Sequence, residues 1–202
     1  MKKLVIFDLD GTLLNTIADL AHSTNYALNK LGYPTHEIEK YNFMVGNGID
    51  KLFERALPEE EKSKENVLRV RKEFVPYYDI HNADDSRPYP GIPELLSYLQ
   101  DAGVQIAVAS NKYQTATQKL VDHYFPEIHF TAVFGQREGV KVKPDPIIVS
   151  DILEVAKVAK EEVLYVGDSG VDMQTAANAG VTACGVTWGF RPRTELEKFN
   201  PS

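Results

Sequence analysis

The sequence contains a single cysteine, Cys184, and no long uninterrupted hydrophobic run. One cysteine excludes an internal disulfide and is compatible with a reducing compartment. Within the run VTACGVT, its side chain is expected to be a small buried hydrophobe rather than a reactive thiol. No apolar stretch reaches the roughly 20 residues of a membrane-spanning helix. The first apolar run, Leu4 to Phe7, is too short for a signal peptide. We therefore predict a cytoplasmic protein that has no membrane partner.

Basic residues are also fewer than acidic ones. The chain has 22 Lys and Arg and 29 Asp and Glu, and its formal net charge is -7. This balance disfavours non-specific binding to nucleic acids, which we do not expect as partners. It does not exclude an anionic substrate, because a metal ion and one lysine can reverse the field locally. The 202 residues, 43% of them hydrophobic, are enough for one α/β domain with a small insert.

Short apolar runs rich in Val and Ile recur along the chain, with helical patterns between most of them. They lack strict alternation, which is typical of parallel strands covered by helices on both faces. The expected strands cover residues 4–7, 104–109, 132–134, 163–166 and 183–187. The expected helices cover residues 92–102, 146–159 (capped by Asp145, with Pro146 in the first helical position) and 173–179. This order predicts an α/β fold with a Rossmann-like parallel sheet.

The segment from residue 16 to residue 82 breaks this rhythm, because it has helical patterns and no clear strand and is too long for an ordinary crossover. The helices expected there cover residues 17–31, 49–57 and about 60–78. Residues 81–91, HNADDSRPYPG, consist of turn formers and indicate a linker. We therefore predict a helical domain, residues 16–82, inserted into an α/β core made of residues 1–15 and 83–202.

Two aspartates follow the first expected strand, in the stretch IFDLDGTLLN. Asp8 stands at the carboxyl end of the strand, where open α/β sheets bind ligands. Gly11 allows a sharp turn, and Thr12 can cap local amides or an anion. Like charges as close as Asp8 and Asp10 are costly unless they share a cation, and carboxylate oxygens suit Mg²⁺. The alternative is a turn in which both carboxylates face solvent.

Other expected strand ends also carry polar side chains. Asp168 ends a strand and Asp172 follows four residues later, so a helical turn would place both on one side, although acidic residues are also common in a first helical turn. Ser110 and Asn111 end the stretch IAVASN and could hold phosphate oxygens. Lys143, in KVKPDP, lies in a loop from which its ammonium could reach the same edge. Ser110 as a plain helix cap and Lys143 as a surface lysine are the alternatives.

Taken in order, these motifs resemble the haloacid dehalogenase superfamily of phosphotransferases. DLDGT (8–12), SN (110–111), KPDP (143–146) and GDSGVD (167–172) follow one another as in that family and span nearly the whole chain. The insert resembles the helical cap of the phosphoglycolate phosphatase-like branch. Its stretch VGNGIDKLFERALP (45–58) is similar to that branch's cap loop. The resemblance implies a haloacid dehalogenase-like core with a cap domain.

The resemblance also implies a role for each motif residue. Asp8 would be the nucleophile that forms an aspartyl-phosphate, and Asp10 the general acid and then the general base. Mg²⁺ would be held by Asp8, the Asp10 main-chain carbonyl and Asp168, with Asp172 ordering a metal-bound water or ligating weakly. The residues implied to bind the phosphoryl group are Thr12, Ser110, Asn111 and Lys143. The cap residues that would contact the substrate, or merely shape a turn, are Asn47, Gly48 and Lys51.

The implied function is a Mg²⁺-dependent phosphatase for a small phosphorylated metabolite, with 2-phosphoglycolate as the family's reference substrate. The dehalogenase branch lacks a carboxylate two residues after its nucleophile, whereas this chain has Asp10. A sugar phosphomutase or a pyrophosphatase on the same scaffold stays open. A regulatory phospho-acceptor is a further alternative, which Asp10 disfavours because it would speed hydrolysis of the acyl-phosphate. We expect a monomer or homodimer, with cap hinges near residues 14–17 and 80–88.

Overall fold

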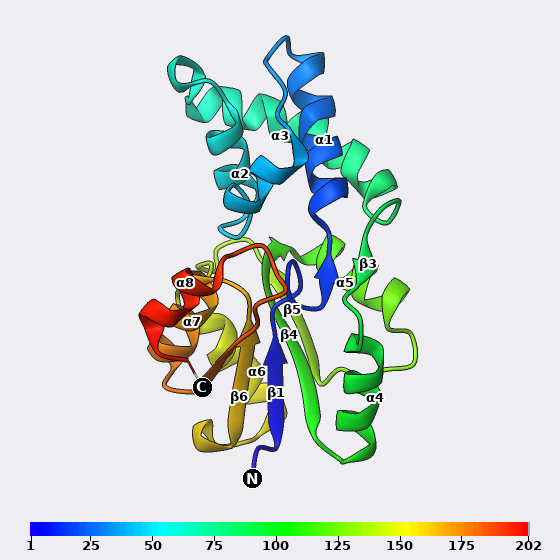
Figure 1. The fold of residues 1–202 in the computed structure, drawn as a ribbon, viewed down its shortest axis with the longest axis vertical. Helices are drawn as coiled ribbons and strands as arrows, with labels where there is room; N and C mark the ends of the chain where they lie inside the picture. The colour runs from blue at the N-terminus through cyan, green and yellow to red at the C-terminus, as the bar shows by residue number, and fades with distance from the viewer. Residues whose placement is uncertain (202) are drawn as a thin grey trace.

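A five-stranded parallel sheet forms the centre of the computed structural model, which describes residues 1–201 (Figure 1). The strand order is β5-β4-β1-β6-β7. The strands are β1 (Leu4–Phe7), β4 (Gln105–Tyr113), β5 (Ala132–Gln136), β6 (Val163–Gly167) and β7 (Thr182–Gly185). β1 pairs in register with β4 on one side and β6 on the other. The predicted α/β fold with a parallel sheet is confirmed.

Helices cover both faces of this sheet. They are α4 (Ile92–Asp101), α5 (Gln114–Tyr124), α6 (Ile147–Ala156), α7 (Gly170–Ala179) and the short α8 (Arg193–Leu196), with 3-10 turns at Lys160–Glu162 and Glu197–Phe199. Successive side chains of a strand point to opposite faces. Val5 and Phe7 therefore pack with α4 and α5, whereas Leu4 and Ile6 pack with α6 and α7. Burial on both faces explains why the strands read as continuous apolar runs.

Some element ends differ from the sequence prediction. Pro146 is the N-cap of α6 rather than its first residue, and the Asp145 side chain accepts a hydrogen bond from the amide of Ile147. The helix ends at Ala156, before the predicted residue 159, because Lys157 has a left-handed backbone conformation (φ 56°). α7 begins at residue 170, earlier than predicted, since the Ser169 side chain caps its first turn.

The helical insert stands over the carboxyl edge of the sheet (Figure 1). It contains α1 (Ile17–Lys30), α2 (Ile49–Ala56), α3 (Lys64–His81) and 3-10 turns at Ile38–Phe43 and Glu59–Glu61. Its helices pack around a hydrophobic cluster that includes buried Phe53, Phe74 and Tyr78, and Ala116 of α5 joins this cluster from the core. The helix predicted from about residue 60 is divided in two, because Ser63 caps a new helix by accepting a hydrogen bond from the amide of Asn66.

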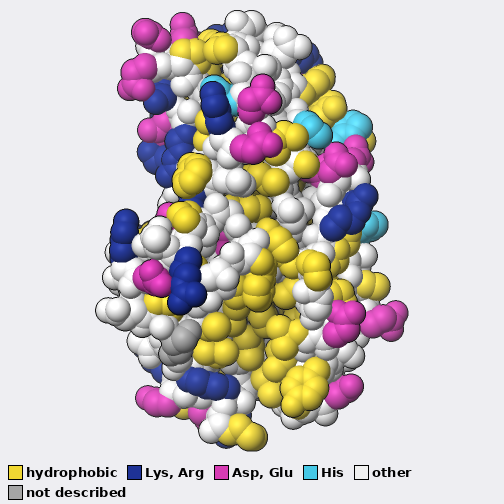
Figure 2. Space-filling view, in the orientation of Figure 1, with side chains coloured by type: hydrophobic (Ala, Val, Ile, Leu, Met, Phe, Trp, Pro, Cys, Tyr) yellow, Lys and Arg dark blue, Asp and Glu magenta, His cyan; other side chains and the backbone are white. Residues whose placement is uncertain are grey.

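Two short strands connect the insert to the sheet. β2 (Leu14–Asn15) pairs antiparallel with β3 (Arg87–Pro88), so both crossings lie side by side. Part of the segment predicted as a plain linker is therefore a strand. On the face that Figure 2 shows, Lys and Arg side chains are scattered among acidic ones, and hydrophobic side chains gather in the lower half. Within residues 1–201, no helix combines the length and apolar character that crossing a membrane requires.

Candidate active site

Three buried carboxylates meet at the carboxyl edge of the sheet. Asp8 directly follows β1 and Asp168 directly follows β6, its neighbour in the sheet, while Asp172 lies in the first turn of α7. Their exposed fractions are 8%, 2% and 0%. One carboxylate oxygen from each lies within 4.8 Å of the other two. The structure thus brings together residues that are 160 positions apart, and the alternative of solvent-facing aspartates does not hold for Asp8.

Lys143 supplies a buried positive charge to this cluster. Its Nζ lies 2.9 Å from Oδ1 of Asp8 and 2.7 Å from Oδ1 of Asp172, and it donates to the carbonyl oxygen of Ala109 at 2.8 Å. Its side chain is 1% exposed, so it is not a surface lysine. The loop that carries it is held by Asn111, whose Oδ1 accepts from the Lys143 amide and whose Nδ2 donates to the Lys143 carbonyl.

Asp172 is saturated with donors from the protein itself. Its Oδ1 accepts from Lys143 and from the hydroxyl of Tyr165, and its Oδ2 accepts from the amide and hydroxyl of Ser169 at 3.1 and 2.6 Å. The Ser169 contacts form a capping box at the start of α7. Asp172 is therefore placed to orient Lys143, with less lone-pair capacity left for a cation than Asp8 or Asp168.

Asp168 is packed against two glycines and a threonine. A Cβ added to Gly11 or to Gly189 would overlap Asp168, and Gly11 also has a positive φ of 88° that disfavours other residues. Thr12 Oγ1 donates to Oδ1 of Asp168 at 3.2 Å, and the Phe190 amide donates to Oδ2 at 2.8 Å. The Thr12 side chain, which was expected to bind phosphate, thus points to Asp168 and does not line the pocket described below.

The electrostatics of the cluster show an excess of negative charge. Burial, followed by the charge of Asp172, raises the pKa of Asp8 well above its usual range, although Lys143 opposes this. Burial and then Asp172 raise the pKa of Asp168 to about 7. Burial alone would lower the pKa of Lys143, but Asp172 and Asp8 outweigh it and the pKa is raised. One ammonium does not balance three carboxylates, so the cluster fits a divalent cation, which oxygen ligands of this kind prefer.

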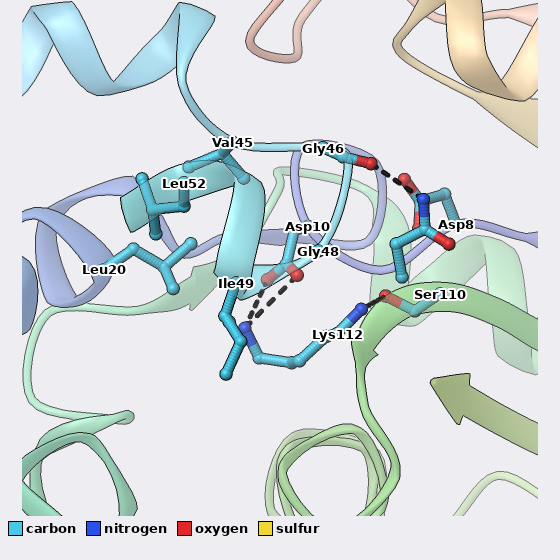
Figure 3. A pocket seen from close by; sticks show the side chains of 11 residues that line it. Asp8, Asp10, Leu20, Val45, Gly46, Gly48, Ile49, Leu52, Ser110 and Lys112 are labelled. Carbon is cyan, nitrogen blue, oxygen red and sulfur yellow. Dashed lines mark hydrogen bonds and ion pairs between the residues drawn. The ribbon is translucent and has the colours of Figure 1, made fainter. Parts of the chain in front are cut away.

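Asp10 faces away from this cluster into a pocket between the sheet and the helical insert (Figure 3). Its Oδ1 accepts from Thr16 Oγ1 at 2.6 Å and from Lys112 Nζ at 3.0 Å. The lining residues are Asp8, Asp10, Leu20, Val45, Gly46, Gly48, Ile49, Leu52, Ser110, Asn111 and Lys112. Lys112 is not among the residues predicted from the sequence, although its position directly after the SN motif was a usable signal.

Only part of the predicted cap loop faces the pocket. Gly48 lines it, together with Gly46. Asn47 is turned aside, because its Oδ1 accepts from Arg55 at 2.7 Å. Lys51 is 56% exposed and pairs with Glu54 at 2.6 Å. The structure therefore places Asn47 and Lys51 outside the lining, where both make local contacts within the insert.

The loop before α2 is docked onto the core. The carbonyl of Gly46 accepts from Asn111 Nδ2 at 3.0 Å. Arg191 donates to the carbonyls of Val45, at 2.9 Å, and Asn42. These contacts hold the loop against the sheet beside the pocket. The pocket beside this loop has a cavity volume of about 30 Å³, room for about one water molecule.

Comparison with known proteins agrees with this geometry. Residues 5–186 match the family model of the haloacid dehalogenase-like hydrolases. The chain belongs to this family. Proteins similar to it include the phosphoglycolate phosphatase of Vibrio parahaemolyticus, which is 33% identical, with 98% of this chain and 90% of that protein covered. That of Mesorhizobium japonicum is 32% identical, with 100% and 89% covered. The resemblance read from the motifs is confirmed.

Solved structures of this family agree in fold over the whole chain. The crystal structure of a protein from Lactobacillus delbrueckii subsp. bulgaricus superposes on this chain with a TM-score of 0.93 at 34% sequence identity. The superposition covers 100% of this chain and 93% of the Lactobacillus chain. A predicted phosphoglycolate phosphatase from Haemophilus somnus gives a TM-score of 0.91 at 30% identity, with 99% and 92% covered. The arrangement of core and helical insert is thus shared with these proteins.

Proposed function

We propose that this hydrolase is a Mg²⁺-dependent phosphatase that cleaves a small phosphomonoester through an aspartyl-phosphate on Asp8. The observation that carries the proposal is the pairing of two differently placed carboxylates. Asp8 lies in the charged cluster with Lys143, and Asp10 lies two residues on, facing the pocket. Similarity to phosphoglycolate phosphatases supports 2-phosphoglycolate as the substrate.

Asp8 is suited to be the nucleophile. Its Oδ1 is held by the Leu9 amide at 2.7 Å and by Lys143 at 2.9 Å. Across residues 1–201, the structure shows no hydrogen-bond donor on its Oδ2. Two donors from different directions, one of them from the backbone, restrict the turning of this carboxylate during attack on phosphorus, which lowers the entropic cost of reaching the transition state.

Asp10 is suited to move the protons of both half-reactions. In the first, an Asp8 oxygen bonds to phosphorus, the ester P–O bond breaks, and the protonated Asp10 donates its proton to the leaving alkoxide. In the second, the Asp10 carboxylate accepts a proton from a water molecule whose oxygen attacks the phosphorus of the acyl-phosphate. This step releases inorganic phosphate and restores the Asp8 carboxylate.

The metal would be held by Asp8, Asp168 and the main-chain carbonyl of Asp10, with Asp172 contributing through water or weakly. When bound, Mg²⁺ supplies positive charge that stabilises the phosphoryl oxygens in the transition state. Thr12 and the Phe190 amide orient Asp168 for this role through the hydrogen bonds described above.

Phosphate binding falls mainly to Lys143 and Ser110 in this proposal. Lys143 brings a fixed positive charge next to the nucleophile, and Ser110 lines the pocket beside it. Asn111 acts chiefly as a support, because its amide group is engaged by the backbone of Lys143 and Gly46. Thr12 acts through Asp168 rather than on phosphate.

The helical insert would act as a mobile cap. We propose residues 16–82 as the cap and residues 1–15 and 83–202 as the core, with the paired strands β2 and β3 at the hinge. Gly48 and Gly46 would approach the substrate, while the contribution of Asn47 and Lys51 would require the loop to rearrange. We further propose that the enzyme works in the cytoplasm as a monomer or homodimer.

The proposal is tested by phosphate release from a panel of phosphomonoesters that includes 2-phosphoglycolate, with Mg²⁺ and with EDTA. We expect turnover that requires the metal and favours one small ester. If every ester is silent with Mg²⁺ present, the phosphatase proposal is wrong. If a sugar phosphate is isomerised without phosphate release, the enzyme is a mutase instead.

A further inference from the structure

Lys112 is a buried cation beside the site to which the chemistry above gives no role. Its side chain is 2% exposed and lines the pocket. A buried ammonium is costly unless it is paired and hydrogen-bonded. Of the carboxylates in residues 1–201, it pairs with Asp10 alone, with Nζ at 3.0 Å from Oδ1 and 3.2 Å from Oδ2.

The contact with both oxygens fixes the plane of the Asp10 carboxylate. Thr16, just before α1, donates only to Oδ1, and a single hydrogen bond leaves the group free to turn about it. The forked contact with Lys112 removes that freedom (Figure 3). The apolar side chains of Leu20 and Ile49 also line this pocket. They lower the local dielectric, which strengthens the ion pair.

Lys112 is in turn supported by both parts of the molecule. Its backbone amide donates to Ser110 Oγ at 3.1 Å, within the core. Its ammonium lies 4.8 Å from the ring centroid of Tyr78, which belongs to α3 of the insert. The fully buried Tyr78 hydroxyl has no hydrogen-bond partner among residues 1–201. A buried hydroxyl without a hydrogen-bond partner is unfavourable, so the hydroxyl does not explain why a tyrosine stands here. Tyr78 stabilises the Lys112 ammonium through its aromatic ring, which attracts a cation.

We propose that Lys112 is a positioning residue that aims Asp10 at the leaving-group oxygen, and that Tyr78 supports it while the insert is docked. The inference rests on the proposed phosphatase function. Lys112 forms and breaks no covalent bond in it. The forked contact belongs to the ionised Asp10. When Asp10 is protonated, Lys112 keeps its hydrogen bond to the unprotonated oxygen, and the proton on the other oxygen passes to the leaving oxygen as the ester bond breaks. Docking of α3 would complete the support of Lys112. Asp10 would then be correctly oriented only while the insert is docked on the core.

The test compares leaving groups, because a good leaving group departs without a proton. For the best alkyl phosphomonoester of the panel, we expect Lys112→Met to lower kcat/KM by about 10- to 100-fold, a part of the 10²–10⁴ that acid catalysis contributes. For 4-nitrophenyl phosphate, kcat/KM should stay within about threefold, since its phenolate needs no acid. Asp10→Asn should show the same selectivity, and the double variant should lose little more than Asp10→Asn alone.

Two further variants sharpen the comparison. Tyr78→Leu should show the same selectivity in weaker form, with a larger loss than Tyr78→Phe, which keeps the ring. Lys72→Met removes an exposed lysine of the same α3 helix and should leave both substrates unaffected. Thermal unfolding of each variant shows whether the fold is retained.

An equal loss for both leaving groups would mean that Lys112 only maintains the pocket, and would overturn the inference. A loss for 2-phosphoglycolate but not for ethyl phosphate would also overturn it, because Lys112 would then bind the substrate carboxylate. If the unchanged enzyme released phosphate from no ester, the proposed function would fail and this inference with it. Inactivity of the unchanged enzyme can be told apart from the two outcomes above, because it is measured before any variant is compared.

Discussion

Three aspartates near one edge of the sheet have different hydrogen-bond and ion-pair partners. Asp8, Asp10 and Asp168 are all aspartates near the same edge, yet Lys143 contacts the first, Lys112 the second, and backbone and threonine donors the third. These partners support the proposed roles of Asp8 as nucleophile, Asp10 as proton carrier and Asp168 as metal ligand. Substitutions at these positions should separate the roles.

We expect Asp8→Asn to abolish turnover, because an amide is a poor nucleophile for phosphorus and the acyl-phosphate cannot form. Asp10→Asn should instead lower kcat by roughly 10²–10⁴, the range of a lost general acid–base group. Steady-state phosphate release and trapping of the phosphorylated enzyme measure both. Near-normal turnover in either variant would contradict the role given to that residue.

Metal binding should be visible in stability as well as in activity. Mg²⁺ at 100 times its Kd should stabilise the protein by about 2.7 kcal/mol, and EDTA should reverse this. In Asp168→Asn this stabilisation should be lost, while the metal-free variant should be at least as stable as the metal-free parent, because one of three buried like charges is gone. Thermal unfolding measures both, and Trp188, the only tryptophan, provides a fluorescence signal close to the site. An unchanged metal response in Asp168→Asn would exclude this ligand.

At the scale of elements, the loop before α2 is joined to the core by a few hydrogen bonds. Arg191 follows Phe190, whose amide binds Asp168, and its guanidinium binds the carbonyls of Val45 and Asn42. One short segment thus contacts the acidic cluster and the insert at once. Its replacement should affect closure without removing a group that touches phosphate.

Arg191→Ala should raise KM more than it lowers kcat for the preferred ester, because a docked loop is needed to retain a small substrate. We expect an increase in KM of about tenfold, equivalent to about 1.4 kcal/mol of lost binding. Arg193→Ala is the matched control, since Arg193 is 75% exposed and, among the described residues 1–201, forms an ion pair only with Glu197. Equal kinetics of the two variants would show that the Arg191 contacts do not hold the loop during catalysis.

At the scale of the whole molecule, a buried acidic residue joins the insert to the returning chain. Asp19, on α1, is 2% exposed and accepts hydrogen bonds from the amides of Asp85 and Ser86 and from the Ser86 hydroxyl at 2.9, 2.8 and 2.6 Å. These contacts lie next to the β2–β3 crossing. They keep the two crossing segments together and so couple the insert to the sheet.

Asp19→Ala should lower the free energy of unfolding by about 1–3 kcal/mol, because buried donors lose their acceptor. Since the coupling is weakened, the urea transitions of the helices, followed by circular dichroism, and of the core, followed by Trp188 fluorescence, should separate. Asp85→Ala keeps the Asp85 amide and removes only a side chain that is 55% exposed, so its transitions should coincide. Coincident transitions in both variants would refute the coupling.

Much of this site could be predicted from the sequence, and some of it could not. Asp8, Asp168 and Lys143 were predictable because they follow buried strands or precede a helix, and the carboxyl ends of neighbouring parallel strands share one edge. Lys112 could have been noticed because it follows the SN motif directly, but the direction of its side chain could not be predicted, since the register between β4 and β5 shifts between Ala109 and Tyr113. No periodic pattern therefore shows where that side chain points.

The sequence by itself determined the alternation of strands and helices, the insertion of a helical segment and the identity of the acidic motifs. These depend on local patterns and on residue types, which the chain carries wherever it folds. Tertiary structure alone decided that Thr12 turns to Asp168, that Asn47 turns to Arg55, and that Asp10 pairs with Lys112. Such partners are up to 156 residues apart, and only packing of the whole chain determines which donors reach a buried carboxylate.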